Sequence, residues 1–201
     1  MIGELKFSPY LLGMKPTLTV LLLAIALIGY SQEKIEVEER IKKKDVPANA
    51  LAWVQKTFDL NKRVKWYFEE TSGKISYEAK FYYDYQKYSV EFSSDGTIED
   101  VEIVYRLSEL DPEDKKSLTK ALNKIRKSKI NKIQLQYSGH PELVSRSFRK
   151  GFFNAVEKKY EVEFYGELEG KHAFWEGTFT AWGELINYRE IILPPTDHLI
   201  F

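Results

Sequence analysis

The chain has 201 residues, of which 43% are hydrophobic and 14% aromatic, enough for one or two domains with ring-rich cores. Its 30 basic residues balance its 30 acidic residues, so no excess positive charge recruits nucleic acid or an anionic membrane. The sequence contains no cysteine, which excludes thiol catalysis, cysteine-bound zinc and lipid attachment at a cysteine.

Residues 1–31 have the pattern of a signal peptide. Lys15 precedes an apolar run from Leu18 to Ile28, and Gly29-Tyr30-Ser31 places small residues where signal peptidase cuts. The run is shorter than the roughly 20 residues of a membrane-spanning helix. We therefore expect a periplasmic or secreted protein that begins at Gln32 and has no stable membrane insertion after cleavage. An uncleaved anchor is the alternative.

Two features near the N-terminus stay open at this point. The true initiator is Met1 or Met14, because the segment that begins at Met14 has the proportions of a signal peptide by itself. Residues 32–44 form a charged lead-in with few apolar side chains, which we expect to be mobile or loosely attached.

A first helix is predicted to open at Asp45-Val46-Pro47, because proline is tolerated in the first turn, where its missing N–H costs nothing. Leu51, Val54 and Phe58 then recur at helical spacing. Four strands follow in residues 64–105, since apolar and polar residues alternate there with turn signals between them. The last strand contains a three-residue step between apolar positions, which predicts a bulge.

A second unit begins at Asp111-Pro112, which combines a helix cap with a proline at the first helical position. The residues that follow resemble the first unit: Tyr160–Tyr165 reads YEVEFY where Tyr77–Tyr82 reads YEAKFY. The second unit differs by an expanded hairpin, 138–159, whose SRSFRKGFFNAV segment predicts a short amphipathic helix.

The predicted fold class is α+β, with two tandem modules that each pack one helix on a four-stranded antiparallel sheet. The expected organisation is a signal peptide (1–31), a charged lead-in (32–44), a first module (45–106), a second module (107–192) and a C-terminal tail (193–201).

The first unit also resembles the PepSY-like periplasmic proteins of Bacteroidetes-type bacteria, which are similar in fold to the β-lactamase inhibitory protein. The resemblance is carried by Pro47 with its helix, Val64-Lys65-Trp66, Tyr77-Glu78-Ala79, Tyr88–Phe92 and Asp95-Gly96. It covers residues 45–105 well and 106–192 faintly. It implies export, a helix packed twice on a four-stranded sheet, and a binding or inhibitory role.

Motifs of common catalytic and cofactor sites are missing from the sequence. The three histidines, His140, His172 and His198, stand alone, without the spacing of a metal site. Phosphate-binding glycine loops and a nucleophile elbow are also missing. We therefore expect no enzyme activity, no cofactor and no metal. The carboxylates of Glu78, Glu91, Glu161 and Glu163 fall on the solvated strand face, where we expect cross-strand charge pairs.

The sequence favours an exported, non-catalytic binding module, in the form of a proteinaceous inhibitor or an envelope adaptor. Its partner is expected to be a protein or peptide of the cell envelope, recognised through open sheet faces rich in tyrosine. The candidate partner-binding residues are Tyr67, Lys80, Tyr82, Glu163, Tyr165 and Phe174 on the sheet faces, with Arg149 and Phe152 in the expanded hairpin.

Three interpretations of these features remain open. The phenylalanines of the expanded hairpin either face a partner or cap the second core. The whole protein is alternatively an envelope hydrolase that uses scattered carboxylates, or a structural envelope protein that associates with itself.

Overall fold

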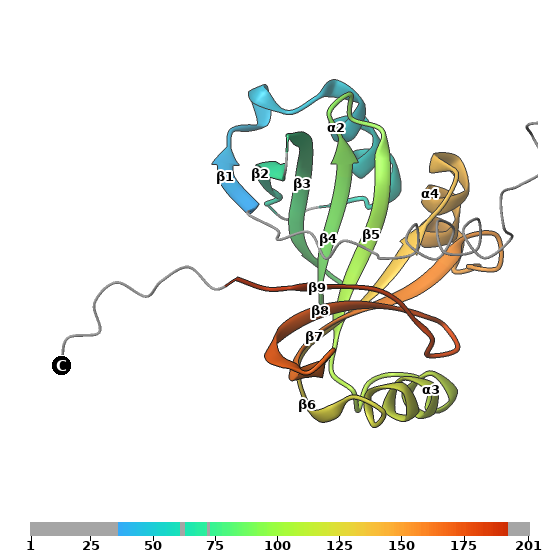
Figure 1. Cartoon of the computed structure of the whole chain (residues 1–201). Coiled ribbons are helices and arrows are strands. Elements are labelled where there is room, and N and C mark those ends of the chain that lie inside the picture. Colours follow the sequence, from blue (N-terminus) through green and yellow to red (C-terminus); the bar gives the residue numbers. More distant parts are fainter. Residues whose placement is uncertain (1–35, 61–62, 72, 193–201) are drawn as a thin grey trace, which may run out of the picture. The chain divides into compact units, whose positions relative to one another are not determined.

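The computed structural model describes residues 36–60, 63–71 and 73–192, which lie in one compact unit. Within these residues, nine strands form a single antiparallel sheet in chain order, from β1 to β9, together with three α-helices (Figure 1). The strands are β1 (Glu36–Ile41), β2 (Lys65–Thr71), β3 (Lys74–Tyr83), β4 (Gln86–Ser93), β5 (Ile98–Tyr105), β6 (Arg126–Ser138), β7 (Glu157–Leu168), β8 (Lys171–Thr180) and β9 (Leu185–Glu190). The helices are α2 (Ala48–Thr57), α3 (Pro112–Leu122) and α4 (Pro141–Lys150), with a short 3-10 helix at Lys43–Asp45.

The prediction of two modules, each with its own four-stranded sheet, was wrong. β5 pairs with β6 from Asp100 opposite Ser138 to Tyr105 opposite Ile133, so the sheet continues from the first predicted module into the second. This pairing satisfies the backbone groups that two separate sheets would leave open at their edges. Side-chain alternation is the same whether β5 and β6 pair or not, which is why the sequence did not distinguish the two arrangements.

The described part of the charged lead-in also differs from the mobile segment that we expected. β1 pairs with β2 along its length, from Glu36 opposite Thr71 to Ile41 opposite Trp66. Ile41 packs against the first core and gives this charged strand an apolar contact with it.

The first core lies between α2 and strands β2 to β5. Val54 and Phe58, predicted on the helix stripe, are buried, and the ring of Phe58 meets that of Phe81 at 5.0 Å. Trp53 lies beside the stripe and donates a hydrogen bond through Nε1 to the carbonyl of Pro141, at 3.2 Å. This bond and the buried Thr57–Ser145 hydroxyl pair, at 2.8 Å, fix α2 against α4.

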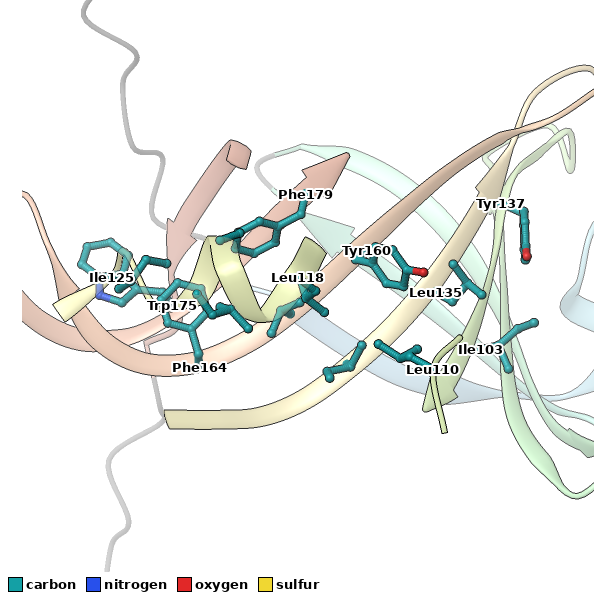
Figure 2. Packing of buried hydrophobic residues seen from close by; sticks show 14 residues of the cluster. Ile103, Leu110, Leu118, Ile125, Leu135, Tyr137, Tyr160, Phe164, Trp175 and Phe179 are labelled. Carbon is teal, nitrogen blue, oxygen red and sulfur yellow. The ribbon is translucent and has the colours of Figure 1, made fainter. Parts of the chain in front are cut away.

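The second core lies between α3 and strands β6 to β9. α3 begins at Pro112 with Asp111 as its cap residue, as predicted. Figure 2 shows Leu118 of this helix among the rings of Phe164, Trp175 and Phe179, all of them buried. The two cores are separate clusters of buried residues, but Phe148 of α4 packs against both.

The predicted bulge in β5 is confirmed. Glu91 pairs with Asp100 whereas the next residue, Phe92, pairs with Ile98, so Glu99 is the extra residue. Because the bulge shifts the alternation by one residue, Ile98 and Val101 both face the core. Asp100 therefore lies on the opposite face of the sheet.

Candidate functional site

The sheet face opposite the two cores is polar and forms a hollow of about 590 Å³, which we call the acidic hollow. Its walls come from both halves of the chain, since residues of β1 to β8 line it. The lining includes eight carboxylates: Glu38, Glu69, Glu78, Glu91, Glu102, Glu161, Glu163 and Glu176. Strand alternation places them there, because their neighbours in sequence belong to the cores.

Lys80 connects two carboxylates at one side of the acidic hollow. Its Nζ lies 2.6 Å from Glu78 and 3.1 Å from Glu38, and 4.7 Å from the centre of the Tyr67 ring. Burial by itself would lower the pKa of Lys80, but the hydrogen bonds and charges of the two carboxylates raise it above its ordinary value. Lys80 is therefore a fixed cation that links β3 to β1 across the intervening strand β2.

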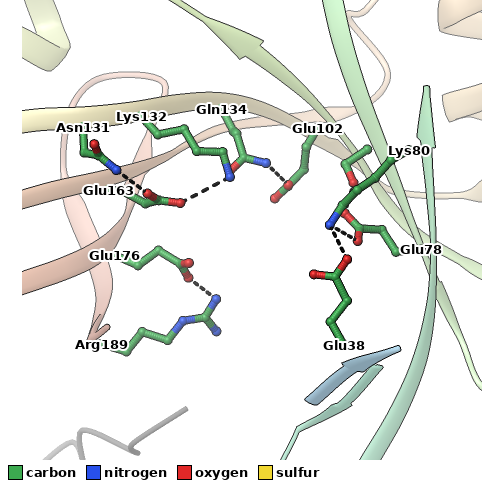
Figure 3. Close-up of polar contacts among 11 residues, drawn as sticks. Glu38, Glu78, Lys80, Glu102, Asn131, Lys132, Gln134, Glu163, Glu176 and Arg189 are labelled. Carbon is green, nitrogen blue, oxygen red and sulfur yellow. Dashed lines mark hydrogen bonds and ion pairs between the residues drawn. The ribbon is translucent and has the colours of Figure 1, made fainter. Parts of the chain in front are cut away.

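Charge pairs also line the opposite side of the acidic hollow (Figure 3). Glu163 accepts a hydrogen bond from Asn131 at 2.8 Å and pairs with Lys132 at 3.2 Å. Glu176 pairs with Arg189 of β9. The expectation of cross-strand charge pairs is confirmed for Glu163, and Glu78 pairs with Lys80 of its own strand.

Between these two sides, three carboxylates gather on β4 and β5. One oxygen each of Glu91, Asp100 and Glu102 lies within 4.8 Å of the other two. The described hydrogen bonds to Asp100 and Glu102 come from neutral amides: Gln136 donates to Asp100 at 3.1 Å, and Gln134 donates to Glu102. The second oxygen of Asp100, Oδ1, is buried and has no hydrogen-bond partner among the described residues.

Burial raises the pKa of both Asp100 and Glu102 well above the ordinary carboxyl range, and neighbouring carboxylates raise it further. For Asp100 the main neighbour is Glu91, and for Glu102 it is Glu161. Among the described groups, Glu91, Asp100 and Glu102 have the oxygen ligands that a hard divalent cation prefers, as do Glu38, Glu69 and Glu78.

Four of the predicted partner-binding residues line the acidic hollow: Tyr67, Lys80, Tyr82 and Glu163. Tyr165 and Phe174 lie on the same face outside the lining, opposite each other on β7 and β8, with their rings 5.3 Å apart. The structure therefore brings the six predicted sheet residues to one face. Their role in binding stays a prediction.

Arg149 and Phe152 lie elsewhere, because α4 packs on the core side of the sheet. Arg149 pairs with Glu142 of the same helix at 3.3 Å, and Phe152 is 75% exposed just after the helix end. Of the two interpretations of the hairpin phenylalanines, core packing holds for Phe148 and Phe153. It does not hold for Phe152.

The sequence interpretation missed the exposed ring of Tyr85. The hairpin between β3 and β4 turns at Asp84 and Tyr85, which both have positive φ angles, 43° and 64°. Tyr85 is 99% exposed. Such turns favour Asn-Gly, so Asp-Tyr gave no turn signal. Tyr82 and Lys87, which pair on either side of this turn, line the acidic hollow.

The two described histidines, His140 and His172, lie on different elements. His172 pairs with Glu167 at 3.0 Å and stacks on Tyr165, and His140 precedes α4. His198, the signal peptide and the C-terminal tail lie outside the described residues. In the part of the chain that the structure describes, no helix combines the length and apolarity needed to cross a membrane.

No protein-family model matches the sequence, and no curated protein matches it. Among solved structures, the chain is similar to a DUF2874 family protein from Bacteroides ovatus, with 14% identity and a TM-score of 0.49 over 73% of this chain and 89% of the other. It is also similar to a BLIP-like protein from Bacteroides fragilis, with 13% identity and a TM-score of 0.48 over 76% and 92%. A third likeness is to a provisionally assigned periplasmic protein from Bacteroides eggerthii, with 11% identity and a TM-score of 0.49 over 72% and 88%.

These names describe the neighbours themselves: one is called BLIP-like, and all three come from Bacteroides species. The PepSY-like label stays a prediction. Likeness of fold does not determine function, which depends on the groups that a surface presents.

Proposed function

We propose that the protein is an exported, non-catalytic binding module whose acidic hollow receives a segment of a partner protein. The observation that carries the proposal is a sheet face that the described helices leave uncovered in both halves of the chain and that forms a 590 Å³ hollow. Export rests on the signal-peptide pattern of residues 1–31. The proposed location is the periplasm.

The chemistry of the acidic hollow suits a protein partner. Tyr67 and Tyr82 supply large rings with few rotatable bonds, so that contact costs little side-chain entropy. The charged side chains around them are held in pairs, so the polar pattern exists before the partner arrives. Interfaces that combine tyrosine with fixed charges gain selectivity for a partner of complementary charge.

Site-specific photo-crosslinking in cells tests this proposal. A photoreactive phenylalanine analogue replaces Tyr67 or Tyr82, and the matched control carries it at Lys120, an exposed position on α3. Mass spectrometry should identify one partner protein crosslinked from both positions in the acidic hollow and not from the control. Equal adducts from all three positions, or none from any of them, would contradict the proposal.

A hydrolase is the second candidate, because the acidic hollow joins carboxylates of both halves and two carboxyls, of Asp100 and Glu102, have raised pKa values. A raised carboxyl pKa is a property of general acids. Turnover of chromogenic glycosides or esters that Glu102→Gln abolishes would favour the hydrolase. The binding proposal expects no turnover above that of Glu102→Gln.

A further inference from the structure

We propose that the partner segment carries an acidic stretch, which binds a second, basic hollow next to the acidic hollow. This inference rests on the proposed binding function and specifies the chemistry of the partner. It follows from the charge of the second hollow, from its apolar walls and from the wall that the two hollows share.

The second hollow, which we call the basic groove, has a volume of about 730 Å³ and is lined by residues of β1, the 3-10 helix, α2 and the start of β2. Neighbouring charges are paired with each other, Lys44 with Asp45 and Glu38 with Lys80. None of the described residues that line the basic groove is acidic, and five are basic and have no ion-pair partner among the described residues: Arg40, Lys42, Lys43, Arg63 and Lys65.

The charge of the basic groove favours an anionic ligand. Five positive charges around one hollow repel one another, and a carboxylate that enters between them replaces repulsion with attraction. Arginine can donate paired hydrogen bonds to such a carboxylate. All five side chains are exposed, so a ligand can reach them. The equal numbers of acidic and basic residues in the whole chain conceal this local positive charge.

The walls of the basic groove favour a peptide over a free inorganic anion. Phosphate has no apolar part and leaves apolar walls in contact with water, whereas a peptide can place carboxylates on the cations and an apolar side chain on the walls. The apolar side chains of the lining are buried at Trp66 and half-buried at the other positions: Ile41, Leu51, Leu60 and Val64.

The position of the basic groove favours the partner segment itself as its ligand. Arg63 and Lys65 line both the basic groove and the acidic hollow, so the two hollows adjoin at the start of β2. Tyr67 of the acidic hollow lies two residues beyond Lys65 on this strand, a rise of about 7 Å. An extended segment that contacts Tyr67 therefore needs only a few more residues to reach the basic groove.

Titration of the full chain followed by NMR tests the inference. The probe is the peptide acetyl-Glu-Glu-Leu-Glu-Glu-amide, and its control is acetyl-Gln-Gln-Leu-Gln-Gln-amide, which has nearly the same shape and no charge. We expect saturable shifts of the backbone amide signals of Lys42, Lys43 and Trp66 with the acidic peptide and none with the control. The response should weaken as salt is added.

A matched pair of variants separates the basic groove from a general attraction of acidic peptides. Arg40→Gln with Lys43→Gln removes two cations that line the basic groove and not the acidic hollow, and should weaken binding of the acidic peptide about tenfold. Lys116→Gln with Lys120→Gln removes the same charge from exposed positions on α3 and should leave binding unchanged.

Equal binding of the two peptides, or equal weakening in the two variants, overturns the inference. Inorganic phosphate and phosphatidylglycerol vesicles are two further arms of the titration. Saturable binding of either at the same residues, without a response to the acidic peptide, would assign the basic groove to a phosphate group and also overturn the inference.

Crosslinking from Tyr67 and Tyr82 separates this inference from the proposed function. If Arg40→Gln with Lys43→Gln captures the partner as well as the wild type does, the binding function stands and only the acidic stretch is wrong. If neither tyrosine position captures a partner in the wild type, the proposed function fails, and with it the assignment of the basic groove to the partner segment.

Discussion

At the scale of single residues, the most consequential group is the set of carboxylates on β4 and β5. Glu91, Asp100 and Glu102 are close together because the bulge at Glu99 places Asp100 opposite Glu91. Their proximity raises the free energy of the folded state whenever more than one of the three carboxyl groups is ionised.

The first prediction concerns the pH dependence of stability. Asp100 and Glu102 have folded-state pKa values above their ordinary values of 3.8 and 4.5, so above those values the folded state binds more protons than the unfolded state. The free energy of unfolding should therefore fall as the pH rises from 5 to 8. Asp95 and Glu142 have lowered pKa values, and their stabilising effect is lost only below the ordinary carboxyl range.

Urea denaturation of Glu102→Gln checks this prediction. Glutamine removes the charge and can still accept a hydrogen bond from Gln134. At pH 8 the variant should exceed the wild type in stability by on the order of 1 kcal/mol, with a smaller gain at pH 5. Glu184→Gln serves as the exposed control and should show neither effect. A gain of equal size at both pH values would contradict the assignment of the raised pKa.

At the scale of elements, the β3–β4 hairpin holds an exposed ring in an unfavourable backbone conformation. Asp84 and Tyr85 have positive φ angles, a conformation that suits glycine and is costly for tyrosine. Burial does not offset this cost, since Tyr85 is 99% exposed. Backbone strain of this kind gathers at functional sites.

The second prediction is that Tyr85→Gly stabilises the fold and weakens the capture of the partner. The free energy of unfolding should rise by about 1 kcal/mol, because glycine adopts the positive φ angle without steric cost. Thermal or urea denaturation measures this change. Lys87→Gly, at an exposed position of the adjacent strand, should instead destabilise the protein, since glycine weakens strands. Loss of stability in Tyr85→Gly would show that the ring has a packing role.

The third prediction concerns α4, which joins the two cores through Phe148. Phe148→Ala should lower the free energy of unfolding by about 3 kcal/mol, because the ring contacts Phe58 at 5.3 Å and Phe153 at 5.1 Å. Phe152→Ala is the matched control from the same segment, and its 75% exposed ring should contribute less than about 0.5 kcal/mol. Similar losses in the two variants would contradict the assigned packing.

The elements themselves could be predicted from local signals, whereas their assembly could not. Pro47, Asp111 and Pro112 mark helix starts that the structure confirms within a residue. The apolar step from Ile98 to Val101 predicted the bulge. The pairing of β5 with β6 joins residues 28 to 38 positions apart, from Tyr105 opposite Ile133 to Asp100 opposite Ser138, and no local pattern specifies it.

The candidate site was predictable only in part, because strand alternation is a local signal whereas burial depends on the assembled sheet. Alternation alone placed Tyr67, Lys80 and Glu163 on the solvated face, where they line the acidic hollow. Asp100 and Glu102 escaped notice because charged residues on a strand normally face water, and their burial depends on how the sheet curves around them.

At the scale of the whole molecule, one sheet supports two separate cores. The backbone ladder between β5 and β6 and the ring of Phe148 connect the cores. The mechanical consequence is that neither half can lose its strands without exposing the edge of the other half. The acidic hollow also depends on both halves of the chain, since its carboxylates come from strands of each half.

The fourth prediction is therefore a single cooperative unfolding transition. The four tryptophans can carry fluorine labels, and Trp66 reports on the first core while Trp175 reports on the second. Their folded-state ¹⁹F NMR signals should disappear at the same urea concentration. Single Trp→Phe replacements assign the signals. Two distinct midpoints would instead describe two independently stable halves.

The order of the sheet also bears on how the molecule reaches this state. Each strand from β1 to β9 lies beside its neighbour in the sequence. The β2–β3, β3–β4, β4–β5, β7–β8 and β8–β9 connections are short, and a helix lies in each of the other three. Short loops cost little entropy to close, so the sheet can form strand by strand as the chain is synthesised, before its last residues are available.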